Sequence, residues 1–286
     1  MSKKICQTVI LIVDKKSLQF EIYTNLDVTK MQITEYKIKL PFSVDEAQIG
    51  SIFTQMEARK ELDGVKVKHD TPFSGFNQYP GFELYDSGRY TYIEYKANNK
   101  EMSERIPDWL LSMFQLPEEM IIHQETWDNF PYILTVTTMP GFFKQNFHTI
   151  VESYYGTSDS PPIHENYQTK LGLKKHAAVN IDIANDKIDD YEEGKDPTKC
   201  KTGKGPLTSD WQSGEGPFST VYQTASVNCS LDVDLFNVAE GMMAKTAEQE
   251  IIKYFKSLYC FSGEWTKLSL EEVKAMDQTQ LNQMKF

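Results

Sequence analysis

The 286-residue sequence predicts a single α+β domain in which an antiparallel sheet wraps around a long helix. Three observations support this prediction. Apolar and polar residues alternate in several short segments, as they do in half-buried strands. Two serine-led capping boxes mark the starts of helices. Residues 236–258 carry apolar side chains at helical spacing, which is typical of one long amphipathic helix.

The first strand and the first helix are the most sharply defined elements. Alternating apolar residues at 36–40 predict a strand that ends before Pro41. Ser43 and Glu46 then form a capping box, because the serine oxygen can accept from the third helical N–H group while the glutamate reaches back to the serine N–H. The helix that follows should end near Gly64.

The later elements follow from the same rules. Residues 65–100 hold short segments with turn signals, and residues 185–218 are mostly polar and are interpreted as a long functional loop. The last helix begins at a second capping box, Ser269 to Glu272. Further strands are expected at 89–96, 132–138, 147–155, 178–183 and 222–229, a short helix at 107–114 and a loop at 158–162.

The composition excludes several classes of protein. The net charge of −11 argues against a general nucleic-acid binder and against a polybasic membrane anchor, since both need a surplus of Lys and Arg. No stretch approaches the ~20 apolar residues of a transmembrane helix. The apolar block at 8–13 is followed by Asp14 instead of a small-residue cleavage site, so we expect no signal peptide.

No pattern in the chain demands an enzyme or a metal ion. The four cysteines contain no CxxC pair, so we expect reduced thiols instead of a zinc site or a disulfide framework. The five histidines contain no HExxH pair, and the run at 202–206 lacks the spacing of a phosphate-binding P-loop. We therefore expect no catalytic residue and no metal ligand.

Several stretches, taken in order, resemble the phosphatidylinositol transfer protein family. They are YKIKLPFSVDE at 36–46, GRYT at 88–91, IHQETW at 122–127, NIDIA at 180–184 and KTGKGPL at 201–207, followed by Trp211 and Trp265. The resemblance runs from about residue 31 to the C-terminus. It implies an N-terminal extension of unknown role at 1–30 and a START-like domain at 31–286.

The resemblance implies a START-like helix-grip fold, in which a curved antiparallel sheet and long helices enclose one phospholipid. Such a protein moves phosphatidylinositol or phosphatidylcholine between membranes without chemistry. We therefore expect a cytoplasmic monomer that touches membrane surfaces transiently and takes a phospholipid as cargo, with no cofactor. The cavity must be closed, because roughly 30 methylenes at ~0.8 kcal/mol each would otherwise meet water.

Two alternatives remain open at this level. A lipid sensor would bind a phospholipid and present it to a kinase or an adaptor without fast transfer. An enzyme in the same cavity would need a buried acid–base pair, and the spacing of the histidines and carboxylates suggests none.

The resemblance also implies which residues contact the lipid. The expected contacts are Thr91, Thr135, Ser153, Tyr254 and Asp277, together with Asp128, which stands where the family has asparagine. Ser51 replaces a family glutamine. The family cations are missing at Ile93 and Gln223, which leaves the preferred head group undetermined, since a charge-assisted bond is worth about 1.5–3 kcal/mol. Arg89, Lys96 and Lys253 are the candidates to compensate.

Membrane docking is expected on the segment before the long helix. The family has consecutive tryptophans there, whereas this chain has Leu231 and Asp232. Tryptophan anchors interfaces, and aspartate is repelled by anionic leaflets. Leu231, Leu235 and Phe236 are therefore the docking candidates, with a buried helix start as the alternative for the last two.

Overall fold

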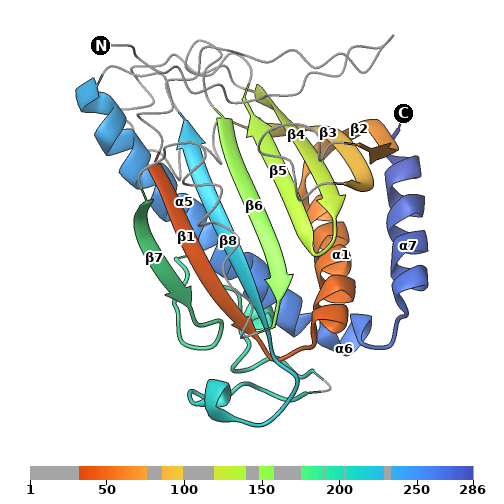
Figure 1. Cartoon of the computed structure of the whole chain (residues 1–286), viewed down its shortest axis with the longest axis vertical. Coiled ribbons are helices and arrows are strands. Elements are labelled where there is room, and N and C mark those ends of the chain that lie inside the picture. The colour runs from red at the N-terminus through yellow and green to blue at the C-terminus, as the bar shows by residue number, and fades with distance from the viewer. Residues whose placement is uncertain are drawn as a thin grey trace.

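The computed structural model describes residues 32–75, 86–98, 119–139, 148–157, 175–189, 191–202, 204–228 and 233–285. Within them, an eight-stranded sheet carries its long helices beside and behind it, which confirms the expected α+β class (Figure 1). Three sequence-based expectations lie outside the described residues: the extension at 1–30, the helix at 107–114 and the loop at 158–162.

The sheet has the strand order β2-β3-β4-β5-β6-β8-β1-β7. Its strands are β1 (Gln32–Leu40), β2 (Asp63–Ser74), β3 (Ser87–Asn98), β4 (Glu119–Asn129), β5 (Tyr132–Thr138), β6 (His148–Gly156), β7 (Lys175–Ile181) and β8 (Ser219–Asn228). Every pairing is antiparallel except that between β1 and β7. The expectation of a purely antiparallel sheet is wrong at this edge, where the long intervening chain can supply the crossover that parallel strands need.

The sequence also misled at two strands. Residues 63–74 form one continuous strand, β2, instead of short segments, and the strand β4 was not expected. In β4 only Met120, Ile122 and Trp127 are buried, and residues 123–126 between them are polar and half-buried. A strand whose inner face is partly polar loses the alternation on which the sequence reading depends.

The helices begin where the capping boxes predicted. The helices are α1 (Val44–Glu61), α5 (Val233–Cys260), the short α6 (Ser262–Trp265) and α7 (Leu270–Gln283). Ser43 Oγ accepts from the Glu46 N–H at 3.1 Å, and the Ser43 N–H donates to Glu46 Oε2 at 2.8 Å. Ser269 and Glu272 make the same two bonds at the start of α7, at 3.2 and 2.8 Å. Both capping boxes are confirmed.

The hydrophobic core joins β1, β6 and β8 to α1 and α5. Its largest fully buried side chain is Trp265, which packs edge-on against Phe42 with ring centroids 4.7 Å apart. A Cβ atom at Gly50 of α1 would lie 2.9 Å from the Trp265 ring, so glycine allows this close approach. The Trp265 Nε1–H donates to the Leu258 carbonyl at 2.9 Å. The turn after α5 is thereby fixed, and it directs α7 back along α1 (Figure 1).

The polar segment at 185–218 is held by specific contacts. Asp182 accepts from the side chains of Trp211 and Gln212, each at 2.9 Å, and burial of Trp211 ties the segment to the core. Cys200 and Cys260 are free thiols that share a hydrogen bond. Across the part of the chain that the structure describes, no helix is long and apolar enough to cross a membrane.

Candidate functional site

A cavity of about 760 Å³ lies between the inner face of β3 and β4 and the helices α1 and α7. Its lining is mixed. Ile52 of α1, Leu62 just after α1 and Phe130 after β4 supply apolar surface, while polar and charged side chains come from the two strands and from α1 and α7. Tyr254 of α5 completes the wall. The site is therefore suited to a ligand with both an apolar and a polar part.

Strand alternation explains which side chains of the sheet reach the cavity. Arg89, Thr91 and Ile93 are two residues apart in β3 and all line it, and Thr126 and Asp128 do the same in β4. Thr91 lies opposite Thr126 in the sheet.

The row of threonines continues into β5. Thr135 is the register partner of Thr126, and their hydroxyl oxygens are 3.3 Å apart. Thr135 is not among the lining residues, so it lies one strand beyond the cavity. Thr91, Thr126 and Thr135 therefore form a band of hydroxyl groups across three strands.

Ser153 and Gln223 lie further along the sheet. They are register partners on β6 and β8. The residues two positions away, Tyr155 and Val221, belong to the apolar core, so Ser153 and Gln223 share the inward face with them. Neither residue lines the cavity. Gln223 Oε1 is buried and has no hydrogen-bond partner among the described residues.

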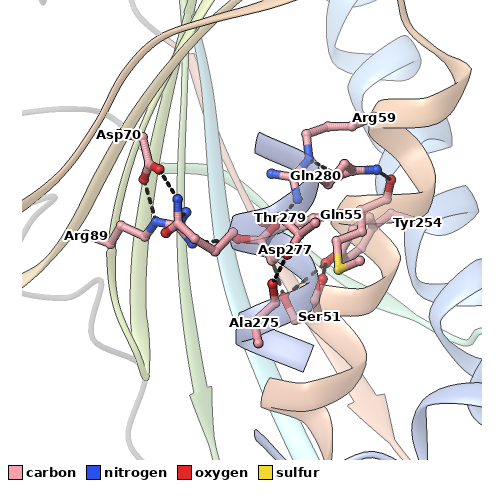
Figure 2. Close-up of polar contacts among 12 residues, drawn as sticks. Ser51, Gln55, Arg59, Asp70, Arg89, Tyr254, Ala275, Asp277, Thr279 and Gln280 are labelled. Atoms are coloured by element: carbon pink, nitrogen blue, oxygen red, sulfur yellow. Dashed lines mark hydrogen bonds and ion pairs between the residues drawn. The ribbon is translucent and has the colours of Figure 1, made fainter. Parts of the chain in front are cut away.

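Two tyrosines meet at Ser51 beneath the cavity. Tyr254 Oη lies 3.0 Å from Ser51 Oγ and donates to the Ser51 carbonyl at 3.2 Å, and Tyr155 donates to Ser51 Oγ at 3.2 Å. Burial raises the pKa of both phenols, so they stay neutral. Figure 2 shows Tyr254 and Ser51 facing each other between α5 and α1. Tyr254 thus presents a fixed ring to the cavity.

Asp128 brings a half-buried carboxyl group to the cavity wall. Its Oδ1 accepts from the Phe130 N–H at 3.1 Å. Burial raises the pKa of Asp128, although this N–H and the positive charges of Lys274 and Arg89 oppose the rise. Asp128 consequently holds its proton more firmly than an exposed aspartate.

Asp277 of α7 lies between two arginines (Figure 2). Its Oδ1 pairs with Arg59 Nη2 from α1, and its Oδ2 lies 2.5 Å from Arg89 Nη1 of β3. The side chains of Asp277 and Arg59 are only 9% and 11% exposed, so water screens their pairing little. Both carboxylate oxygens therefore already have a guanidinium partner.

Further bonds extend this network along α7. Arg89 Nε lies 2.7 Å from Asp70 Oδ1, and Gln278 Nε2 donates to Asp70 Oδ2 at 2.6 Å. Burial alone would raise the pKa of Asp70, but the bonds from Arg89 and Gln278 hold it below its usual value. On the other side of α7, Gln280 accepts from Arg59 Nε at 3.0 Å and donates to the Met56 carbonyl at 2.9 Å. These polar contacts dock α7 onto α1 and the β2–β3 edge together with the buried side chains of Val273 and Leu281.

The structure brings together some of the expected site residues and not others. Thr91, Asp128, Tyr254 and Asp277 line the cavity, together with Arg89 and Ile93. Thr135 and Ser153 share the sheet face without lining it. Lys96 pairs with Glu119 and Lys253 with Glu192, and neither lysine lines the cavity. Leu231 lies outside the described residues, and of Leu235 and Phe236 only the helical backbone is described.

Several lining residues were not predicted from the sequence, among them the polar residues Arg59, Thr126 and Lys274. Arg59 follows Ile52 and Gln55 on one face of α1, a spacing that would have identified it once the inward face of the helix was known. Thr126 depends on the unexpected strand β4. Lys274 depends on where α7 docks, which no local pattern reveals.

Comparison with known proteins gives a consistent result. A family model described as phosphatidylinositol transfer protein matches residues 31–282. The chain is similar to phosphatidylinositol transfer protein 1 of Dictyostelium discoideum, with 26% identity over 259 residues, 86% of this chain and 92% of the relative. It is also 23% identical over 256 residues to cytoplasmic phosphatidylinositol transfer protein 1 of Drosophila melanogaster, covering 86% and 87% of the two chains.

A longer relative matches over the same region. The chain is 26% identical over 272 residues to membrane-associated phosphatidylinositol transfer protein 1 of Homo sapiens, which covers 87% of this chain. The match spans only 20% of that relative's length.

Proposed function

The chain belongs to the phosphatidylinositol transfer protein family, and from this membership we propose that it binds one phospholipid molecule and transfers it between membranes. The cargo is phosphatidylinositol, phosphatidylcholine or both. The observation that carries the proposal is the family match over residues 31–282, which includes every residue that lines the cavity.

The chemistry of the cavity supports the proposal. A phospholipid needs apolar surface for its acyl chains and hydrogen-bonding groups for its head group, and the lining offers both. Because α7 forms one wall, we propose that cargo enters and leaves by movement of α7, which makes exchange a gated step. No catalytic residue is proposed.

The residues proposed to contact the lipid fall into two sets. Thr91, Asp128 and Tyr254 line the cavity and are proposed to meet the head group directly, whereas Asp277 acts through its two arginines. Thr135 and Ser153 are proposed to contact the lipid further along the sheet face.

The setting in the cell is also a proposal. We infer a cytoplasmic monomer that touches cytosolic membrane faces transiently, with Leu231, Leu235 and Phe236 as the docking residues. One relative is named cytoplasmic and another membrane-associated, which is consistent with a protein that meets membranes transiently.

The test is to purify the protein, extract bound lipid for mass spectrometry, and follow transfer of labelled phospholipid between vesicles. A matched pair of variants controls for the cavity: Ile52→Trp fills it, whereas Ile121→Trp places the same bulk on an isoleucine that is 47% exposed. We expect bound phospholipid and transfer in wild type and Ile121→Trp, and loss of both in Ile52→Trp.

Other outcomes would contradict the proposal. Tight binding without transfer would indicate a lipid sensor, and a chemically altered lipid would indicate an enzyme. Absence of any phospholipid from wild type would remove the carrier function altogether.

A further inference from the structure

Positive side chains gather on one side of the cavity, where α7 meets α1 and β3. Arg59, Arg89 and Lys274 line this side, and Lys285 joins them through Asp70 at 3.5 Å. The carboxylates that pair with these cations are Asp70 and Asp277. Asp128 on the cavity wall is a third carboxylate near Arg89 and Lys274. The four cations outnumber the three carboxylates, so this side of the cavity carries surplus positive charge that a bound anion would neutralise.

Two of the cations retain unused donors. Arg59 Nε donates to Gln280 and Arg59 Nη2 donates to Asp277. The third nitrogen, Nη1, has no hydrogen-bond partner among the described residues. Lys274 makes no hydrogen bond or ion pair within that part of the chain, although it lines the cavity. Both residues therefore have N–H groups available to a ligand.

The two donors flank a common carboxylate. Lys274 precedes Asp277 by three residues, so their side chains are neighbours on one face of α7. Arg59 reaches the same face by pairing with Asp277. The bonds to Asp277 and Gln280 fix the guanidinium plane before any ligand arrives, which lowers the entropic cost of binding.

We propose that Arg59 and Lys274 bind the phosphate of the cargo, with Asp277 and Arg89 positioning Arg59. This inference rests on the proposed function, in which the cargo is a phospholipid. A planar guanidinium and a mobile ammonium together match the oxygens of a phosphodiester, and the rest of the cavity receives the attached lipid.

The placement of the two donors has a mechanical consequence. Arg59 belongs to α1 and Lys274 to α7, so a phosphate bound by both bridges the fixed helix and the helix that closes the cavity. Cargo with a phosphate therefore stabilises the position of α7 over the cavity. Cargo without a phosphate leaves α7 held only by the contacts of the empty protein.

The experiment compares two ligands with the same acyl chains, phosphatidylcholine and diacylglycerol, taken up from vesicles by the full chain. The variants are Arg59→Gln and Lys274→Gln. Lys60→Gln is the matched control, because Lys60 neighbours Arg59 on α1 but is 56% exposed and pairs with Glu57. We expect each test variant to retain about tenfold less phosphatidylcholine with diacylglycerol unchanged, and the control to change neither.

A second readout separates binding from structure. Amide hydrogen exchange of α7 should slow when wild type is loaded with phosphatidylcholine and not with diacylglycerol, and Lys274→Gln should remove the difference. If Arg59→Gln does not fold, the double variant Arg59→Gln/Asp277→Asn removes both charges of the pair and serves in its place.

Several results would overturn the inference. If Arg59→Gln retains less phosphatidylcholine and less diacylglycerol to the same extent, Arg59 has only a structural role. If neither test variant loses phosphatidylcholine, the phosphate binds elsewhere. Displacement of the lipid by inorganic phosphate would reveal a general anion site. If wild type takes up no phosphatidylcholine, the proposed function itself fails, which is distinguishable from these results.

Discussion

The two ends of the sheet use its inward face differently. Around β1, β6 and β8 that face is mostly apolar and packs on α1 and α5, with Trp265 fully buried beside it. Around β3 and β4 the same face carries Arg89, Thr91 and Asp128 over a cavity. The first end contains most of the hydrophobic core, whereas the second holds a wall, α7, by ion pairs and hydrogen bonds as well as by the buried side chains of Val273 and Leu281. Because its ion pairs lie at the cavity and two of its side chains are buried, we expect α7 to open before the rest of the core unfolds.

The largest expected effect tests the apolar end. Trp265→Ala removes a fully buried ring from between α1 and α5, and we expect a loss of about 3–5 kcal/mol in the free energy of unfolding. Urea unfolding followed by tryptophan fluorescence and by circular dichroism would measure it. Both signals should move together, since the core is one cooperative unit.

The next effect tests the polar end. Asp277→Ala leaves Arg59 and Arg89 without their shared partner, and breaking a buried pair costs about 3 kcal/mol or more. Unlike the core variant, it should act locally. Hydrogen exchange should quicken in α7 while α5 stays protected, and equal loosening of both helices would contradict the separation.

The same comparison shows what sequence can and cannot reveal. Strand alternation and the capping boxes correctly located α1, α7 and most strands, because these signals are local. The strand β4 was missed because its inward face is polar, and the parallel β7 was misjudged because strand direction is set by distant pairing. The strands at the apolar end of the sheet were thus easier to predict from the sequence than those at the polar end.

The candidate site was only partly predictable for a related reason. The resemblance identified Thr91, Asp128, Tyr254 and Asp277, which all line the cavity. It did not identify Arg59 or Lys274, since their roles depend on how α7 docks. Arg59 and Lys274 bring positive charge to the cavity from α1 and α7, a placement that only the tertiary structure displays.

A smaller effect is expected at the start of α7. Ser269→Ala removes the side-chain acceptor of the Glu272 N–H and should cost about 1 kcal/mol. Because Ser269 is exposed, the cost should be confined to fraying of the first turn. Hydrogen exchange of the amides after residue 269 would detect it. The equivalent Ser43→Ala in α1 is the comparison, and it should lower global stability because α1 belongs to the core.

The smallest effect concerns pH and the cavity wall. The pKa of Asp128 is raised above 3.8 in the folded protein, so the folded state holds this proton more tightly than the unfolded chain. Burial of Asp128 therefore does not lower the free energy of unfolding at a pH below 3.8. It lowers that free energy increasingly as pH rises through the folded pKa, because the carboxyl group must then lose its proton. Asp128→Asn should be more stable than wild type at neutral pH, with the gain vanishing near pH 4. Urea unfolding at both pH values measures it, and a gain that persists in acid would point to a different cause.

The central claim is that α7 is a movable wall, held by ion pairs at the cavity and by two buried apolar side chains, that responds to a phospholipid before the core does. Hydrogen exchange of the wild-type protein, with and without bound phospholipid, tests it most directly. The account predicts that α7 exchanges faster than α1 and α5 in the empty protein and slows selectively on loading. Exchange of α7 at the rate of the core, unchanged by phospholipid, would contradict it.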